Sequence, residues 1–456
     1  MNTIVQIGRK EADDDGAQQI LNSFTLPVME YARSCSLFSL MEGYLHLKMK
    51  AVKYSSQDKI KELICSIVAG CEHTVSINHR LVPDTALAGE LIGKDRFADQ
   101  SGINRLLHAF TEENLAELEG VFEQDYMRNG RAWRLPSGET VIVDLDMTGF
   151  RVQGKTYEGA EKGYIERGRK GAKGYKASFV YVHREEREVL GCIFDRGKAV
   201  ESTHIDRIVE LVKMRLGSPS LKRIVFRGDP AYGTAPMVNR CLQRGYLFLF
   251  KGRLSSSARK YAKRVEEWVK VKDEKEGGGE DVYAGELRVK LPGSRSKTRV
   301  VVFRSVKEKK DGKTKEEFMH LLTNLHESLY TAKGLLEMYH EREGMEAFIK
   351  CDKSGLHMKN LRTRNLVGIK AFVLLTCITH NLIVHAIRSM KRIIKNGSIG
   401  VKAFVEKLAP ARAWFIRKKG ALTLLFTEEN PTIKQYIRYS RGRTSLDQRH
   451  GLFAQN

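Results

Sequence analysis

The period of apolar positions changes along the chain. Residues 1 to about 130 carry apolar side chains at helical spacing, as in LFSLMEGYLHLKMKAV and DKIKELICSIVAGC. From about residue 137, the runs ETVIVDLDMTG and KASFVYVHREEREVLGCIF predict a strand and a hairpin. IDRIVELVKMRL and APMVNRCLQRG then predict helices, each followed by a strand, LKRIVFRGD and YLFLFKGR. Strands that alternate with helices after an initial hairpin indicate an α/β sheet of mixed direction.

This alternation stops near Arg253, where short strands alternate with charged, Gly-rich turns. Helical spacing resumes at YTAKGLLEMYHEREGMEAFIK, and a strongly apolar helix follows at about 365–387. Its most apolar run, AFVLLTCIT, is too short to span a bilayer, so we expect a buried core helix and no membrane partner. The five predicted segments are a helical N-terminal DNA-binding domain (1–130), a core (131–253), a β-rich insertion (254–325), the second part of the core (326–392) and a basic helical C-terminal region (393–456) that binds DNA or holds a partner subunit.

Charge and cysteine content narrow the class of protein. The formal net charge is +23, and an excess of this size favours a polyanionic partner, nucleic acid in particular. The seven cysteines form no C-x-x-C pair, so we expect reduced thiols rather than a zinc site. The N-terminus, MNTIVQIGRKEADDDG, is polar and acidic, unlike a secretory signal. We therefore expect a cytoplasmic protein, associated with the nucleoid in a prokaryote.

One segment of the N-terminal region resembles a helix-turn-helix. DTALAGELIGKDRFADQSGINRLLHAF contains a helix, a break at a glycine and a second helix opened by Asp99, Gln100 and Ser101. Two packed helices with no role in DNA binding would give the same pattern, so both interpretations stay open.

Three acids end apolar strands, where ligands gather in α/β sheets. Asp144 and Asp146 lie two residues apart in VIVDLDMTG and therefore share one face of a strand. Asp229 ends the strand IVFRGD and precedes Pro230. An acid on a buried strand is costly unless it is paired or binds a metal. Solvation at the strand end for the first two, and a turn for Asp229, are the structural alternatives.

The helix that begins near residue 332 carries a charged stripe along its buried side. Arg342, Glu346 and Lys353 fall within about 60° of Tyr339 on a helical wheel. An exposed helix with an i,i+4 pair between Arg342 and Glu346 would look the same in isolation. Together with the strand-end acids, however, the stripe predicts a carboxylate site for two Mg²⁺ ions, with Mn²⁺ as a substitute. Arg342 and Lys353 would hold DNA phosphates, and Tyr339 would stack on or brace a nucleotide.

The order Asp, Asp, Glu on a mixed sheet, with a β-rich insertion before the Glu, resembles DDE transposases with an RNase H-like core. The spacing of Tyr339, Arg342, Glu346 and Lys353 is similar to the Y-R-E-K signature of one bacterial insertion-sequence group. The resemblance covers about residues 137–390. By motif it implies Asp146, Asp229 and Glu346 as catalytic and metal-binding residues. Asp144 stays an alternative for the first Asp, and Glu343, also within about 60° of Glu346, for the Glu.

The resemblance implies cut-and-paste transposition of double-stranded DNA. The protein would bind terminal inverted repeats, cleave by hydrolysis, pass in some members through a hairpin intermediate, and join the 3′ end to target DNA as a homodimer. We also expect DNA contacts from a basic loop after the first Asp and from one further cation, namely Arg167, Arg169, Lys170, Lys173 and Arg253. A cellular repair nuclease of the same fold, a DNA-binding derivative without catalysis and an RNA-binding protein are the alternatives.

Overall fold

The computed structural model divides the chain into two compact units. It describes residues 3–7, 16–50, 53–131, 140–166, 171–183, 188–216, 223–253, 255–272, 281–308, 314–395, 399–418, 421–427, 430–438 and 440–441. Unit 1 comprises Met1–Gly130, Gln153–Gly159 and Lys350–Asn456, and unit 2 comprises Arg131–Val152 and Ala160–Ile349. Each unit therefore joins segments that are far apart in the sequence.

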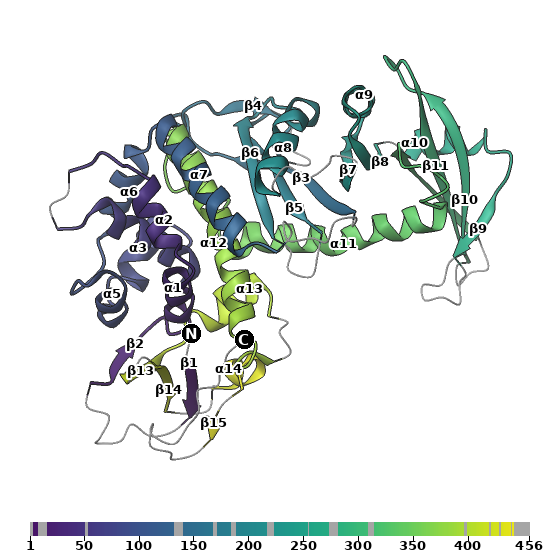
Figure 1. Ribbon diagram of the computed structural model, residues 1–456. Helices are drawn as coiled ribbons and strands as arrows, with labels where there is room; N and C mark the ends of the chain where they lie inside the picture. The colour runs from purple at the N-terminus through teal and green to yellow at the C-terminus, as the bar shows by residue number, and fades with distance from the viewer. Residues whose placement is uncertain are drawn as a thin grey trace. The chain divides into compact units, whose positions relative to one another are not determined.

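Unit 2 is an α/β unit built on one large mixed sheet (Figure 1). Its strands are β3 (Val141–Arg151), β4 (Glu161–Gly163), β5 (Ala172–Val182), β6 (Val189–Arg196), β7 (Ile224–Gly233), β8 (Leu247–Gly252), β9 (Val269–Lys272), β10 (Asp281–Lys290), β11 (Lys297–Glu308) and β12 (Thr314–Thr323). Its helices are α8 (Glu201–Arg215), α9 (Ala235–Arg244), α10 (Ser255–Ala262) and most of α11 (Ala332–Gly355). The strands and helices predicted for residues 137–253 are thus confirmed.

The central strands of this sheet combine both directions. β6, β5 and β3 form an antiparallel meander, whereas β3, β7 and β8 are parallel neighbours. The parallel strands are connected through α8 and α9, as expected for strands joined by crossover helices. The predicted mixed direction is therefore confirmed, and β3 and β7 pair in parallel from Val141 and Ile224 to Leu145 and Gly228.

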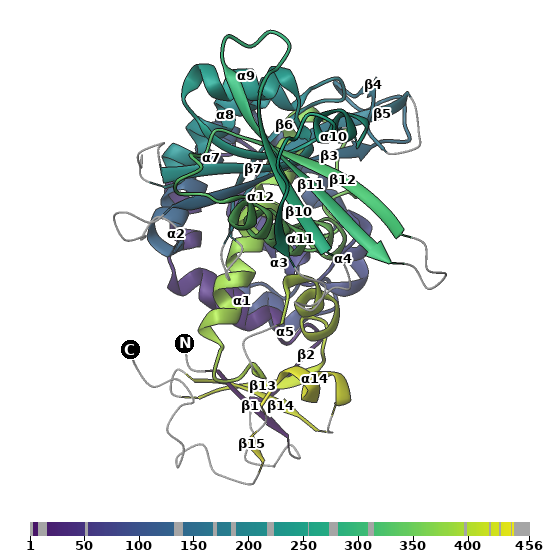
Figure 2. The ribbon, with the colours of Figure 1, turned by 90° about the vertical axis from the view of Figure 1, so that its right-hand side faces the viewer.

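The predicted insertion is β-rich and continues the same sheet. β12 pairs with β8 antiparallel, and β11, β10 and β9 follow in order. Figure 2 shows β10, β11 and β12 side by side. The first turns of α11 pack on this extension, where Leu335, Leu336 and Tyr339 share one core cluster with Leu249 and Val301. Burial of such apolar side chains contributes about 1.5–3 kcal/mol each, so the extension anchors the start of α11.

Unit 1 is built around the long apolar helix α12 (Leu366–Ser389). Its other helices are α1 (Thr25–Ser34), α2 (Leu37–Tyr44), α3 (Ser56–Val68), α4 (Thr74–Arg80), α5 (Thr85–Ile92), α6 (Gln100–Ala109), α7 (Glu112–Asn129), α13 (Val401–Ala403), the π-helix η5 (Phe404–Leu408) and α14 (Pro431–Tyr436). α12 packs against α1, α3, α6 and α7. Among the described helices, α12 is long and apolar enough to cross a bilayer, but 83 % of its most apolar stretch is buried inside the protein.

The two helices of the predicted helix-turn-helix form where the sequence indicates. α5 ends at Gly93, which has a φ of 63°, and α6 begins after Asp99, whose side chain accepts from the main-chain N of Ser101 and Gly102. α6 packs mainly against α12, α3 and α4. Its role in DNA binding stays a prediction.

The N-terminal domain and the C-terminal region, both predicted to be helical, also contain strands. β13 (Ala413–Lys418) and β14 (Ala421–Phe426) form a hairpin that pairs with β1 (Thr3–Ile7) and β2 (Gln18–Ile20), and β15 (Ser440–Arg441) completes a five-stranded sheet. The apolar runs of both ends are short, and the partner strands lie at opposite ends of the chain. Local spacing therefore gave no sign of this sheet.

The units also cut across the predicted segments. We expected residues 326–392 to complete the core of 131–253, but the boundary between the units falls within α11, and α12 belongs to unit 1. The reason is that an apolar helix of this length has the same pattern whether it covers a sheet or fills a helical bundle.

Candidate active site

The parallel register of β3 and β7 brings the strand-end acids together. Asp144 lies opposite Arg227, and Leu145 lies opposite Gly228. Asp146 and Asp229 are the next residues on these two strands. Paired strands are usually about 4.8 Å apart, so the two acids are close neighbours. The two carboxylates therefore lie side by side where the pairing of β3 with β7 ends. They do not end their strands as we predicted, because β3 continues to Arg151 and β7 to Gly233.

Asp144 forms a buried ion pair with Arg227. Both oxygens accept from Arg227, Oδ1 from Nε at 2.6 Å and Oδ2 from Nη2 at 2.7 Å, and Nδ1 of His183 lies 3.5 Å from Oδ2. Burial by itself would raise the pKa of Asp144, but Arg227 and His183 outweigh it and hold the pKa below its usual value. The side chain is 1 % exposed, compared with 17 % for Asp146. Of these two acids, Asp146 is the one accessible to a ligand.

Asp229 is both a turn residue and a perturbed acid. Its Oδ1 accepts from the main-chain N of Ala231 at 2.9 Å, which is the turn that we had considered as the structural alternative. Burial raises the pKa of this carboxyl to about 6; the positive charge of Arg342 lowers it, and the negative charge of Asp146 raises it. Two neighbouring carboxylates with one raised pKa form a site that favours a bound cation.

Arg342 joins helix α11 to this pair. Its Nη2 donates to the main-chain O of Leu145 at 3.3 Å and lies 3.6 Å from Oδ1 of Asp146. Only 2 % of its side chain is exposed. The predicted contact between Arg342 and a DNA phosphate therefore has to be revised, because the guanidinium faces the carboxylates and the strand end.

Tyr339 likewise faces the interior. Its ring is 6 % exposed in the cluster between α11 and the sheet, and Nζ of Lys251 lies 5.8 Å from the ring centre. In this position the ring cannot stack on a nucleotide, so its predicted role in DNA binding is not supported by the structure. The reason is that Tyr339 lies on the part of α11 that packs on the sheet, where its ring anchors the helix.

The remaining predicted residues divide into two groups. Arg253 follows β8 and is exposed, and Lys173 on β5 is half-buried. The other predicted side chains lie outside those that the structure describes. Glu343, Glu346 and Lys353 belong to α11, of which the backbone alone is described at these positions. Arg167, Arg169 and Lys170 lie outside the described residues altogether.

Two features of the site were missed in the sequence. The first is the partner of Arg227. A charged residue within the apolar strand IVFRGD indicates a buried ion pair, and in the structure its partner is Asp144.

The second feature is a close contact before Asp229. The ring of Tyr232 covers Gly228, where a Cβ atom would lie 2.8 Å from the Cβ and Cγ atoms of the tyrosine. Its hydroxyl donates to Oγ of Ser178 at 3.3 Å, and that oxygen lies 2.9 Å from Nδ1 of His204. These contacts fix the backbone just before Asp229.

The donor set fits a hard divalent cation. Asp146 and Asp229 offer oxygen ligands, and burial together with the negative charge of Asp146 raises the pKa of Asp229 despite the nearby Arg342. Among the side chains that the structure describes, no group of three or more His, Cys, Asp or Glu forms a metal site. The resemblance assigns the third carboxylate to α11, where Glu346 lies one turn beyond Arg342.

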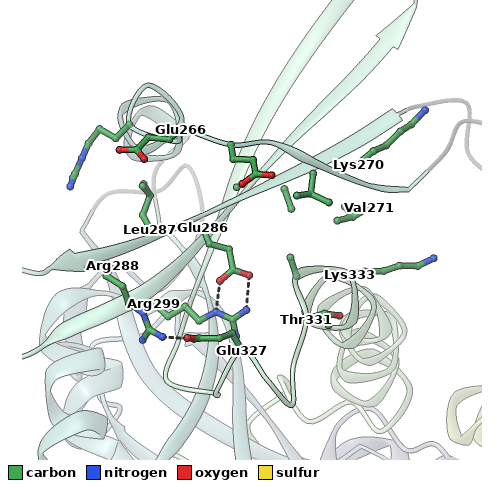
Figure 3. Close-up of a pocket in the computed structure, with 16 residues that line it drawn as sticks. Glu266, Lys270, Val271, Glu286, Leu287, Arg288, Arg299, Glu327, Thr331 and Lys333 are labelled. Carbon is green, nitrogen blue, oxygen red and sulfur yellow. Dashed lines mark hydrogen bonds and ion pairs between the residues drawn. The ribbon is translucent and has the colours of Figure 1, made fainter.

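A separate cavity of about 760 Å³ lies in the insertion (Figure 3). Its wall contains Arg299, which donates to both carboxylate oxygens of Glu286 at 2.8 and 2.6 Å, and an ion pair between Arg288 and Glu327. The wall includes neither Asp146 nor Asp229. The cavity is therefore distinct from the carboxylate site.

Comparison with known proteins gives one family. Residues 11–440 match the family model described as transposase DDE domain group 1. No curated protein matches the chain. The match extends on both sides of the region, about 137–390, over which the sequence resembles DDE transposases.

Proposed function

The chain belongs to the family of transposase DDE domains, and on this premise we propose that it cleaves and joins DNA strands at the carboxylate site. Asp146, Asp229 and Glu346 are the proposed catalytic residues. The observation that carries the proposal is the juxtaposition of Asp146 and Asp229 on parallel strands, together with the raised pKa of Asp229. The proposed core is RNase H-like, and the mixed sheet formed by β6, β5, β3, β7 and β8 supports it.

Each residue has a distinct part in the proposed chemistry. Asp146 and Asp229 hold divalent ions, two when Glu346 completes the set, and Mg²⁺ or Mn²⁺ bound there supplies Lewis-acid activation of the attacking hydroxyl and of the leaving oxygen. The two aspartates are fixed by the sheet, so the phosphodiester meets ligands that do not need to rearrange. The positive charge of Arg342 lies beside Asp146 and lowers the pKa of Asp229, so it offsets part of the repulsion between the two aspartates before an ion binds.

The proposed substrate is double-stranded DNA that carries the terminal inverted repeats of the element. The net charge of +23 supports a polyanionic partner. Arg253 and Lys162 are exposed cations of unit 2, and the ring of Tyr164 is 67 % exposed beside Lys162. We assign them to contacts with phosphates, together with Lys173, Lys353, Arg167, Arg169 and Lys170. Membership of the Y-R-E-K group, a homodimeric complex and a hairpin intermediate are further parts of this proposal.

The test is cleavage of DNA that carries both ends of the element, in Mg²⁺ and in Ca²⁺. We expect strand cleavage at the element boundary in Mg²⁺ alone, and its loss in Asp146→Asn, Asp229→Asn and Glu346→Gln. Glu337→Gln is the matched control, because Glu337 is an exposed residue of the same helix. DNA binding without cleavage by the wild type would contradict the enzymatic proposal. Cleavage that survives in Glu346→Gln would move the third carboxylate to Glu343.

A further inference from the structure

Arg227 is a buried hub that connects two strands and one helix. It extends from β7, and its side chain is fully buried. Nε and Nη2 donate to the two carboxylate oxygens of Asp144 on β3, and Nη1 donates to the main-chain O of Met338 on α11. All three nitrogens of one guanidinium are thus used to join β3, β7 and α11.

Two further residues close this network. Nδ1 of His183 lies 3.5 Å from Oδ2 of Asp144, and its Nε2 lies 3.1 Å from Oε2 of Glu341 on α11. Oε2 of Glu341 is also 3.8 Å from Nη1 of Arg227. We call Asp144, His183, Arg227 and Glu341 the helix clamp, because their mutual contacts hold α11 against the strands.

On β3, β7 and α11 the contacts of the helix clamp precede the proposed catalytic residues in the sequence. Asp144 and Arg227 each precede a catalytic aspartate by two residues, and alternate residues of a strand share one face. On α11, Met338 is held by Arg227, and Arg342, one turn later, is held at Leu145 and Asp146. Glu346 follows after one more turn, about 6 Å along the helix axis.

From this arrangement we propose that Arg227, with Asp144, is a positioning residue that sets the register of α11 against β3 and β7. Through that register it determines whether an acid on α11 reaches the ions held by Asp146 and Asp229. The inference rests on the proposed function. It adds a requirement that the family match does not contain: a buried ion pair behind the site that controls metal affinity.

The alternative is that the pair contributes only to folding, and the chain offers a matched control. Arg299 on β11 is also 1 % exposed, also donates to both oxygens of a carboxylate, and also donates from Nη1 to main-chain oxygens, those of Leu325 and Tyr330. Three strand steps separate β11 from β7, roughly 14 Å. Replacing either arginine by lysine keeps the charge but removes the bidentate geometry.

The experiment compares Arg227→Lys with Arg299→Lys in the full-length protein bound to DNA carrying an element end. Electron paramagnetic resonance counts Mn²⁺ bound to the complex, fluorescence anisotropy in Ca²⁺ gives DNA affinity, and thermal unfolding gives stability. Cleavage is followed as a function of Mn²⁺ concentration. We expect Arg227→Lys to weaken Mn²⁺ binding about tenfold or more, since supporting groups of a metal site commonly have effects of this size. DNA affinity should change less than about twofold, whereas Arg299→Lys should lose stability only.

Equal Mn²⁺ binding and equal metal requirement in the two variants would overturn the inference and leave the proposed function intact. A wild-type protein that neither binds Mn²⁺ in the complex nor cleaves would overturn both.

A second pair of variants covers the case in which Arg227→Lys does not fold. Glu341 contributes to the helix clamp from an exposed position, its side chain being 56 % exposed, and Glu337 lies one turn earlier on the same helix. Glu341→Ala should raise the Mn²⁺ concentration for half-maximal cleavage about threefold relative to Glu337→Ala. Identical values for these two variants would also overturn the inference.

Discussion

Arg342 on α11 and Asp146 on β3 face one another, with 3.6 Å between the guanidinium nitrogen Nη2 and the carboxylate oxygen Oδ1. The same guanidinium lowers the pKa of Asp229, against the effects of burial and of the Asp146 charge. One buried cation thus serves two carboxylates. The balance of charge at this edge of the sheet depends on a side chain that comes from the helix.

Removing this cation should change the pH dependence of cleavage. In Arg342→Gln the pKa of Asp229 should rise above its present value of about 6, because the largest effect that opposes burial and the Asp146 charge is removed. A metal ligand has to be ionised, so the acid limb of the pH–rate profile should move to higher pH. Profiles of the wild type and of Arg342→Gln at low Mg²⁺ would show this. Arg253→Gln, which removes an exposed cation, should leave the limb in place.

Asp229 should make stability depend on pH in an identifiable direction. Its pKa in the folded protein, about 6, exceeds the ordinary value of 3.8, so the folded state binds the proton more tightly. The stabilisation is complete below pH 3.8 and is lost as the pH rises through about 6. At pH 8 the isosteric Asp229→Asn should therefore be more stable than the wild type by about 2–3 kcal/mol, following 1.36 kcal/mol per pKa unit.

Urea unfolding at pH 5 and pH 8 without metal would measure this difference, which should be larger at pH 8. Mg²⁺ should then stabilise the wild type at pH 8 and leave Asp229→Asn nearly unchanged. A difference that stays constant between pH 5 and 8 would show that Asp229 is not the titrating group.

The contact between Gly228 and Tyr232 predicts that a single methyl group disturbs the site. In Gly228→Ala the new Cβ would lie 2.8 Å from Cβ and Cγ of the buried Tyr232, so either that side chain or β7 has to shift. We expect a loss of about 1–3 kcal/mol in the free energy of unfolding, the usual effect of overpacking, and weaker cleavage because Asp229 is the next residue. Gly120→Ala in α7 is the control, since nothing lies within 4 Å of its Cβ position and stability should rise slightly. Unaltered cleavage in Gly228→Ala would show that the site tolerates movement of the strand end.

Unit 1 contains a buried acid whose titration can be followed separately. Oε2 of Glu62 on α3 accepts from the main-chain N of Ala98 at 3.0 Å, and burial raises the pKa of this carboxyl to about 8. Its pKa is higher in the folded state than the ordinary 4.5, so its stabilisation is complete below pH 4.5 and is lost as the pH rises through about 8. Glu62→Gln should therefore gain stability over the wild type between pH 6 and pH 9. Differential scanning calorimetry across this range would measure the gain, and a variant that is destabilised at every pH would refute it.

The strands and helices of the central sheet could be predicted because each element carries its own pattern. VIVDLDMTG and IVFRGD show apolar runs that end in acids, and the resulting parallel pair is what brings Asp146 and Asp229 together. The choice between Asp144 and Asp146 could not be made in this way. It depends on Arg227, whose position opposite Asp144 follows from the register of two strands and not from spacing within one.

The contacts that Tyr339 and Arg342 make on the buried side of α11 were also beyond the sequence. A helical wheel placed the charged stripe along the buried side of the helix, but it does not show that Arg342 contacts Leu145 and Asp146 rather than a DNA phosphate. The five-stranded sheet of unit 1 was hidden for another reason. Its parallel pair of β1 and β14 joins segments with no shared local signal, since strand pairing between distant segments leaves no periodicity in either.

That pairing of β1 with β14 has a consequence for biosynthesis. β1 leaves the ribosome before unit 2, yet the strand it pairs with is translated only after the whole of unit 2 has been made. At 5–20 residues per second this delay is roughly 20–80 s. During this time the nascent chain exposes the apolar edge of an unpaired strand, and a product that stops short of residue 421 never covers it. Full translation is therefore a condition for completing unit 1, and prematurely terminated chains become substrates for proteases and chaperones.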